Sequence, residues 1–497
     1  MRICCSNKAI VLIASALMLL SCEAGARGGD GILNADPLYK VELLKDGKWK
    51  KTDVLSAKVS DYAPNPAEGY PQHIMNFSMF TDDFEDSLKI RITLKGGRKF
   101  GEVAIRPLSY GIKPTFSDGK SVEFTLPDPG KKVSVEFDGD RLGNLFILPD
   151  LPDAEVPQES DSVLYFGPGV HEAGLINVVD KDNYTIYIDE GSVVLGRINA
   201  ERSDNLRICG RGVLCSSKEN HGEGRSPQIT TIDCDNLSLE GIMLRDTPNW
   251  TLKIVGSDGV HIDNIKEIGW IMNSDGMDFV CCSNVLVENT FQRNYDDNIS
   301  IKAFNGTHSY KETNSEDYAA GMVASIPQDK FKVENYEIRN CVFWADKAHN
   351  MLVGPEARGL SFNNIRFHDN IVLENRQDDE TYPGTMAIMV ADNGTFDNIS
   401  FEDIIVEDIN GGKVFCVQFT NSWAYAGLYG QWARNITFRN ISHFGNRASG
   451  SRLFGLNESQ CLDSVVVDNY SENGVKVSGA DNCHIEMNEY VKNVIFE

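Results

Sequence analysis

Residues 236–246 read NLSLEGIMLRD, and the same pattern returns as GVHIDNIKEIG at 259 and as NVLVENTFQRN at 284. Each segment starts with Asn or Gly and continues with alternating β-branched or other apolar residues. Similar segments start at 205, 335, 363, 398, 435 and 464. The first three starts are 23 and 25 residues apart, which is the length of one coil of a parallel β-helix. We therefore predict a right-handed parallel β-helix over residues 160–497.

Other all-β architectures fit the repeats less well. An immunoglobulin-like array or a β-propeller would join its strands by tight hairpins, for which Asn-Gly is the strongest signal. Few such dipeptides occur in this part of the chain. The β-helix is therefore the favoured interpretation.

A different pattern precedes the repeats. Segments such as LKIRITLKG, SVEFTL and KVSVEF place apolar residues at every second position, and Gly, Pro and Asp separate them. Short alternating strands with turn signals between them are typical of an antiparallel β-sandwich. We predict such a sandwich over residues 38–150. The proline-containing segment LPDLPDAEVPQ, residues 148–158, is predicted to be the linker to the β-helix.

The first 22 residues resemble an export signal. A basic residue is followed by the apolar run AIVLIASALMLL, which is shorter than the about 20 residues of a membrane span. The ending Leu-Leu-Ser-Cys resembles a bacterial lipobox, in which the cysteine is lipidated. We therefore expect an exported protein, anchored to the bacterial cell envelope by lipid on Cys22, with residues 23–37 as a linker. A plain secretory signal is the alternative, and it also implies export.

Charge and cysteine content limit the partners. The formal net charge is −25 and no block of Lys or Arg occurs, so nucleic acid is excluded as a partner and a neutral substrate fits best. Nine of the 12 cysteines remain once Cys4, Cys5 and Cys22 are set aside, and no pair has CxxC spacing. We expect buried core cysteines with at most one or two disulfides, no metal, no cofactor and a monomeric protein.

Three polar residues recur at nearly one position of successive coils. Asp275 lies 16 residues after the start at 259, Asp297 lies 13 after the start at 284, and His349 lies 14 after the start at 335. Neighbouring strands of stacked coils are about 4.8 Å apart. We expect these side chains, with Asp296, to form one column on an outer face of the β-helix.

Clustered carboxylates suit the cleavage of glycosidic bonds. Mutual repulsion raises the pKa of one carboxyl group, which then serves as a general acid beside a general base. Inverting glycosidases place these two groups about 6.5–9.5 Å apart to admit a water. The structural alternative is a set of aspartates in solvated turns, which are common in β-helices.

Three segments resemble the motifs of the polygalacturonase family, in the same order. They are NSDGMD at 273–278, DDNISIK at 296–302 and HNMLVGPE at 349–356. The resemblance implies that Asp296 is the general acid, that Asp275 and Asp297 position or deprotonate the attacking water, and that the anomeric configuration is inverted. It further implies a substrate cleft lined by Asn273, Asp278, Lys302, His349 and Glu356.

Two departures from this family affect the expected substrate. The family has an Arg-x-Lys pair suited to a uronate carboxylate, whereas GTMAIMVADNG, residues 384–394, contains no cation. The N-terminal sandwich resembles that of the dextranase and isopullulanase family. We therefore expect hydrolysis of a neutral α-linked glucan or oligosaccharide, with pectin hydrolysis as the alternative. A polysaccharide lyase and a non-catalytic glycan-binding β-helix are the alternatives of another class.

An aromatic segment follows the last motif. TNSWAYAGLYGQW places Trp423, Tyr425 and Trp432 in a glycine-containing loop. Aromatic faces stack on sugar rings, but aromatic residues also cover the ends of coils. We include the three residues as candidate substrate-binding residues.

Overall fold

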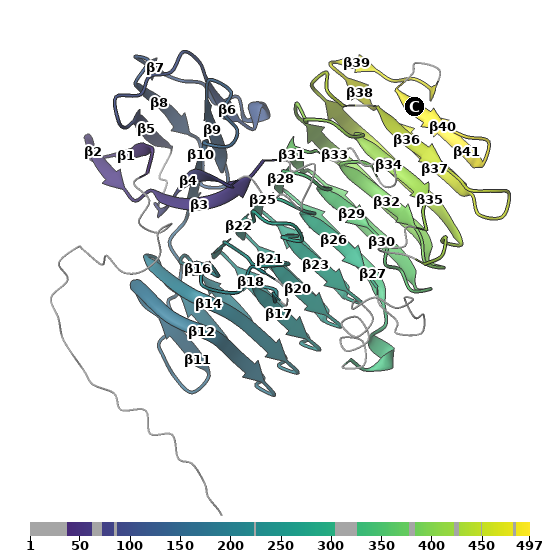
Figure 1. Cartoon of the computed structure of the whole chain (residues 1–497), viewed down its shortest axis with the longest axis horizontal. Coiled ribbons are helices and arrows are strands. Elements are labelled where there is room, and N and C mark those ends of the chain that lie inside the picture. The colour runs from purple at the N-terminus through teal and green to yellow at the C-terminus, as the bar shows by residue number, and fades with distance from the viewer. Residues whose placement is uncertain are drawn as a thin grey trace, which may run out of the picture.

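The computed structural model describes residues 37–61, 72–83, 87–222, 225–303, 326–376, 383–421, 427–448, 450–480 and 484–497. These residues form strands and two short 3-10 turns, η2 (Leu108–Tyr110) and η3 (Gln328–Lys330). Among them no helix is long and apolar enough to span a membrane. Figure 1 shows a small sandwich beside a long stack of strands, so the predicted all-β fold is confirmed.

The sandwich consists of two five-stranded sheets with the orders β2-β1-β5-β8-β7 and β3-β4-β10-β9-β6. Strand β5 alternates buried and half-buried residues, which is the pattern that the sequence predicts for a strand covered on one face. The linker begins later than predicted, because residues 148–150 belong to β10. The strands are β1 (Tyr39–Lys45), β2 (Lys48–Thr52), β3 (Leu55–Ser60), β4 (Gln72–Thr81), β5 (Leu88–Leu94), β6 (Val103–Arg106), β7 (Phe116–Ser117), β8 (Ser121–Leu126), β9 (Val133–Phe137) and β10 (Leu145–Asp150).

The other 31 strands wind into the predicted parallel β-helix, whose coils run diagonally across Figure 1. Three sheets line its sides. The first sheet contains β11 (Val163–Phe166), β13 (Thr185–Ile188), β15 (Arg207–Gly210), β18 (Leu237–Glu240), β21 (Asp258–Asp263), β24 (Ser283–Glu288), β27 (Val333–Arg339), β30 (Ser361–His368), β33 (Thr395–Val406), β35 (Trp432–His443), β37 (Leu462–Asp468) and β41 (Val491–Phe496).

The second sheet faces the sandwich and the third follows it in each coil. The second contains β12 (Gly169–Val179), β14 (Ser192–Glu201), β16 (Val213–Cys215), β19 (Met243–Arg245), β22 (Lys266–Ile268), β25 (Phe291–Asn294), β28 (Val342–Ala345), β31 (Ile371–Glu374), β38 (Ser471–Glu472) and β39 (Val475–Lys476). The third contains β17 (Ile229–Ile232), β20 (Leu252–Val255), β23 (Met277–Val280), β26 (Ile299–Lys302), β29 (Met351–Val353), β32 (Met386–Val390), β34 (Phe415–Phe419), β36 (Ser451–Phe454) and β40 (Ile485–Met487).

A ladder of asparagines explains why the repeats start with Asn. These residues adopt positive φ, which Asn tolerates better than most residues, and so turn the chain into the first sheet. Their amides also bond from coil to coil: Asn335 donates to Asn284 at 2.9 Å, and Asn364 donates to Asn335 at 2.8 Å. The ladder therefore sets the register of successive coils.

The interior of the β-helix is apolar. Phe401 stacks between Phe367 and Phe438, with ring centroids 5.0 and 5.3 Å away. Eight cysteines in the described residues are unpaired, and seven of them are buried. They agree with the prediction of small core residues rather than a disulfide framework.

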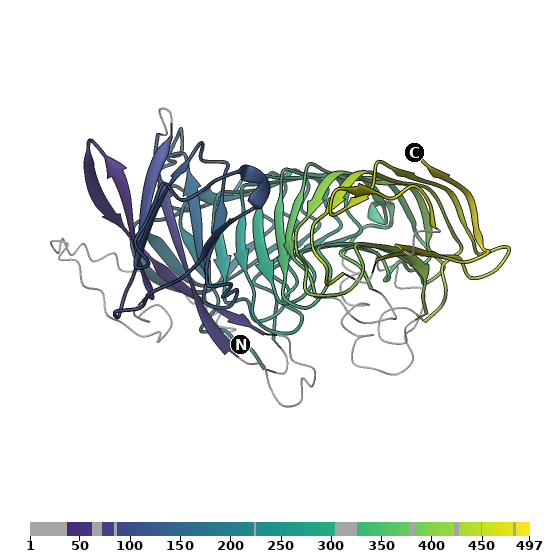
Figure 2. The ribbon, with the colours of Figure 1, turned by 90° about the horizontal axis from the view of Figure 1, so that it is seen from above.

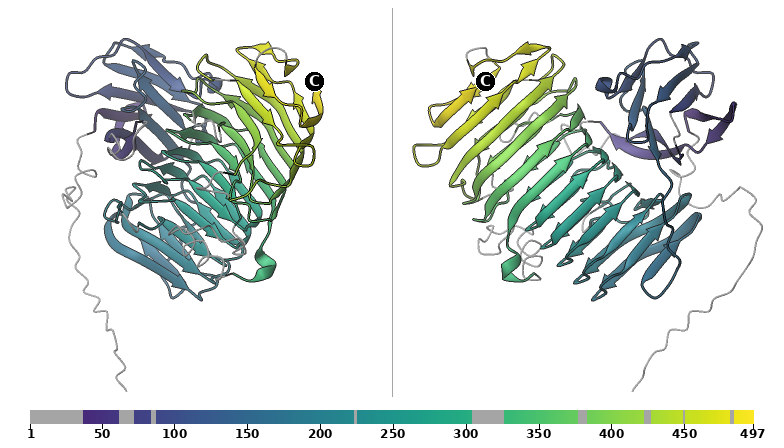
Figure 3. Two further views of the ribbon diagram at one scale, coloured as in Figure 1. Left: turned by 45° about the vertical axis from the view of Figure 1, so that its right-hand side comes forward. Right: turned by 180° about the vertical axis from the view of Figure 1, so that it is seen from behind.

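The sandwich packs directly on the second sheet (Figures 2 and 3). Phe146 contacts the rings of Phe291 and Trp344 in a buried apolar cluster. Asp150 forms a buried ion pair with Lys266, and Ser60 Oγ donates to the carbonyl of Trp270 at 2.6 Å. The sandwich therefore holds the start of the loop 269–276, which leads into the third sheet.

Candidate active site

Strand register confirms the predicted column. Met277, Ile299 and Met351 are neighbours on β23, β26 and β29. Asp275, Asp297 and His349 each lie two residues before one of them, so they occupy equivalent positions in the loops between the second and third sheets. The backbone continues the pairing there, because Gly276 N donates to the carbonyl of Asp297 at 2.7 Å and Asn298 N donates to that of His349 at 2.9 Å.

A cavity of about 250 Å³ opens at this column. It brings together seven of the predicted site residues. They are Asn273, Asp275, Asp296, Asp297, Lys302, His349 and Glu356. Trp250, Met272, Lys347, Ala348, Leu352 and Pro355 complete the lining.

The three aspartates lie closer together than predicted. One carboxylate oxygen from each lies within 4.8 Å of the others, whereas we expected about 6.5–9.5 Å between acid and base. At this distance one water can bridge two carboxylates, because two hydrogen bonds of about 2.7 Å span it. Asp275 and Asp297 are 4% and 7% exposed, so they are enclosed by the cavity walls rather than outward in solvent. Asp296 is half-buried and is therefore the most accessible of the three.

His349 makes Asp297 the ionised member of the cluster. Asp297 Oδ1 accepts hydrogen bonds from His349 N at 3.0 Å and lies 2.7 Å from His349 Nδ1. Burial opposes the charge on Asp297, but the interactions with His349 outweigh it and lower the pKa of Asp297 below its usual value. Asp297 is therefore suited to act as a base.

The other two aspartates favour the protonated form. Burial raises the pKa of Asp296, and the charge of Asp297 raises it further. Burial, followed by the charges of Asp278 and Asp296, raises the pKa of Asp275 well above its usual value. Two carboxyl groups thus have raised pKa values where we expected one. The three groups titrate together, with Asp297 the first to lose its proton.

Lys302 joins the remaining carboxylates. Its Nζ lies 2.6 Å from Asp278 Oδ1, 3.4 Å from Asp275 Oδ2 and 3.5 Å from Glu356 Oε2. Burial opposes its charge, but the carboxylates hold the pKa of Lys302 well above its usual value. Asp278 does not line the cavity itself; burial raises its pKa to about 7 despite Lys302. The ammonium group therefore offsets part of the negative charge beneath the cavity.

Trp250 is the site residue that the sequence reasoning missed. Leu252 pairs with Met277, so Trp250 occupies the column one coil before Asp275. Its ring lies 4.2 Å from Lys302 Nζ. Because it lies 14 residues after the segment start at 236, the offset rule that found His349 could also have found it.

The predicted aromatic platform is not found at this cavity. Trp432 begins β35 on the first sheet, where Arg434 lies 4.2 Å from its ring, and it is absent from the cavity lining. The interpretation of Trp432 as a residue of this site was therefore wrong, because its strand belongs to another side of the β-helix. Trp423 and Tyr425 lie outside the described residues.

The three aspartates also form the kind of group that could hold a metal ion. Calcium takes six to eight oxygen ligands. The Lys302 ammonium lies 3.4 Å from Asp275, where it would repel a cation. The arrangement fits proton transfer better than metal binding.

Comparison with known proteins identifies the class. A model of glycosyl hydrolases family 28 matches residues 211–489, which include all three aspartates, Lys302 and His349. The match covers more than half of the chain, and the protein therefore belongs to glycosyl hydrolases family 28. A search of curated protein sequences gave no match.

Two solved structures share the fold at low identity. Dex49A from Penicillium minioluteum is 13% identical, with 92% of this chain and 94% of that chain covered and a TM-score of 0.54. The exopolygalacturonase from Thermotoga maritima is 18% identical, with 67% and 83% covered and a TM-score of 0.50. The resemblance to β-helix glycosidases that the sequence motifs indicated is thereby confirmed.

Proposed function

We propose that this glycoside hydrolase cleaves a neutral α-linked glucan or oligosaccharide by a single displacement that inverts the anomeric carbon. The carrying observation is the buried Asp297–His349 pair beside a more accessible Asp296 of raised pKa. A base and an acid with opposite pKa shifts are what this chemistry requires.

Each carboxyl group has a distinct role in this proposal. Asp296, the most accessible, protonates the leaving glycosidic oxygen. Asp297, kept ionised by His349, removes a proton from the attacking water. Asp275 favours its protonated form, so we assign it the positioning of that water rather than its deprotonation.

The surface beside the column supports a neutral substrate. Strand β32 lies next to β29 in the segment that lacks the cationic pair. Its Ala387 and Met389 pack with Leu352 and Cys416 in an apolar cluster separate from the interior, and Leu352 lines the cavity. Lys302, in turn, is engaged by three carboxylates. This wall therefore suits a sugar ring better than a uronate carboxylate.

A galacturonate-containing glycan is the second candidate. Family 28 membership and Lys347, a second lysine of the cavity lining, favour it. A carboxylate of the substrate would pair with this ammonium group at the rim.

Substrate preference tests the first candidate against the second. The purified protein should release sugars faster from dextran or pullulan than from polygalacturonate, and NMR of fresh product should show the inverted anomer. A clear preference for polygalacturonate would promote the second candidate. Calcium dependence together with unsaturated products would instead indicate a lyase, and binding to all glycans without turnover would exclude catalysis.

The pH profile should report the two catalytic groups. Asp297 must be ionised, so kcat/KM should fall as pH drops through its lowered pKa. Asp296 must be protonated, so kcat/KM should fall again as pH rises through its raised pKa. His349→Ala removes the interactions that lower the pKa of Asp297, so the acid limb should move to higher pH. An unmoved acid limb, measured between about pH 3 and pH 8, would contradict the pairing.

Export and lipid anchoring are proposed from the first 22 residues, which lie outside the described part of the chain. Cys22→Ala should release the protein from the membrane fraction, because the cysteine thiol would carry the lipid. Cell fractionation and mass spectrometry of the mature N-terminus provide the test. Unchanged membrane association without lipid on the N-terminus would contradict it.

A further inference from the structure

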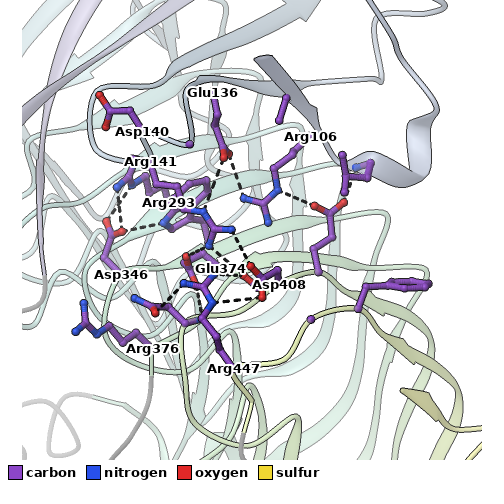
Figure 4. A pocket seen from close by; sticks show the side chains of 18 of the residues that line it. Arg106, Glu136, Asp140, Arg141, Arg293, Asp346, Glu374, Arg376, Asp408 and Arg447 are labelled. Carbon is purple, nitrogen blue, oxygen red and sulfur yellow. Dashed lines mark hydrogen bonds and ion pairs between the residues drawn. The ribbon is translucent and has the colours of Figure 1, made fainter. Parts of the chain in front are cut away.

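A second and larger cavity lies between the sandwich and the β-helix. Its volume is about 1170 Å³, against about 250 Å³ for the cavity at the aspartates. The η2 turn and residues 139–142 line it from the sandwich, and residues 407–410 and 444–447 line it from the β-helix. Figure 4 shows charged side chains from both parts converging on it.

The arginines of this cavity are already paired with carboxylates. Arg106 lies between Glu136 and Glu407 at 3.1 and 2.7 Å, and Arg141 pairs with Glu374 (Figure 4). The five lining arginines face seven lining carboxylates, which gives a formal charge of −2. The remaining pairs are Arg293–Asp346 at 2.9 Å, Arg376–Asp61 at 3.3 Å and Arg447–Asp408 at 2.7 Å. Such a lining disfavours a polyanion.

Polar atoms remain for a neutral ligand. Asp140 Oδ1 accepts from Leu142 N and Gly143 N, while its Oδ2 has no hydrogen bond within the described chain. Asn410 Oδ1 accepts from Arg447 at 2.9 Å, and its Nδ2 donates to no described residue. Hydroxyl groups both donate and accept, so a sugar can bond to both kinds of atom.

Apolar side chains are exposed at the same cavity. Phe444 is 47% exposed and Leu108 is 61% exposed, and both belong to the lining. An exposed aromatic face beside fixed polar groups suits the apolar face of a sugar ring.

The two cavities share a wall. Asp346 lines the larger cavity, whereas residues 347–349 line the catalytic one. Glu374, also in the larger lining, accepts a hydrogen bond from Asn375 N at 3.0 Å, and Asn375 Nδ2 donates to the carbonyl of Ala348. A polysaccharide chain that crosses this wall would contact both cavities.

We propose that the larger cavity is a second glycan-binding site, which holds a neutral segment of the polysaccharide outside the catalytic cavity. The inference rests on the proposed action on a neutral glucan. Phe444 is assigned the stacking contact, and Asp140 and Asn410 are assigned hydrogen bonds to hydroxyl groups.

Native gel electrophoresis in the presence of polysaccharide tests this site. The Asp296→Asn protein, which should not digest the gel, is run with dextran, pullulan or polygalacturonate. We expect retardation by at least one neutral glucan and none by polygalacturonate. Adding Phe444→Ala should weaken the apparent affinity about tenfold, as for an anchoring aromatic residue.

Phe116→Ala is the matched control. Phe116 is also 47% exposed, but it lies on β7 in the other sheet of the sandwich and is absent from the cavity lining. Equal affinity in the Phe444→Ala and Phe116→Ala proteins, or no retardation by either neutral glucan, would overturn the second site. The proposed function is tested separately by hydrolysis with the wild-type protein. Retardation through Phe444 without hydrolysis of neutral glucans would reject that function alone.

Discussion

Asp297→Asn is expected to lower kcat on the preferred polysaccharide by about 10²–10⁴-fold, the usual contribution of a positioned acid or base. The amide oxygen can still accept the hydrogen bonds from His349 N and Nδ1, so the loop geometry should persist. An amide cannot take a proton from water, and the loss should therefore appear in kcat rather than in KM.

Asp403→Asn is the matched control for this change. Asp403 is a turn aspartate of the same β-helix, where it accepts a hydrogen bond from Asn440 at 2.8 Å that an amide oxygen can also accept. Its activity and unfolding temperature should equal those of the wild type. Full activity in both Asp297→Asn and Asp275→Asn would mean that the column consists of ordinary turn aspartates.

Asp296→Asn should lower turnover of the polysaccharide by about 10²-fold or more, because the leaving oxygen would depart without a proton. The loss should shrink to about tenfold or less on a 4-nitrophenyl glycoside that the cavity accepts, since nitrophenolate needs little protonation. Steady-state kinetics on both substrates measure the difference.

Asp297→Asn provides the comparison on the same two substrates. It should be equally impaired on each, because the attacking water must lose a proton in either reaction. Equal losses for Asp296→Asn on both substrates would remove Asp296 from the role of acid and leave Asp275, whose pKa is also raised, as the candidate.

The fold and the column could be predicted because they depend on local repetition. Each repeat starts at a positive-φ residue, and a fixed offset from that start led to Asp275, Asp297 and His349. The same offset also reaches Trp250, so its omission was a failure of search rather than of information.

Other properties depend on burial and on distant contacts, which one sequence does not reveal. The raised pKa of Asp275 results first from its enclosure, which the outward position in a β-helix did not suggest. The pair Arg141–Glu374 joins residues 233 positions apart, and it exists only because the sandwich docks on the second sheet. Trp432 was misplaced because proximity in sequence to an aromatic loop does not specify a side of the β-helix.

The coil-to-coil register also constrains how such a chain can lengthen. Asp275 and Asp297 stand on adjacent coils, so the distance between them is one backbone repeat of about 4.8 Å. An extra coil inserted between β33 and β35 would extend the molecule by that repeat and leave the aspartates where they are. The same insertion between β23 and β26 would double their separation. Duplication of coils is thus compatible with catalysis everywhere except across the three coils that carry Asp275, Asp297 and His349.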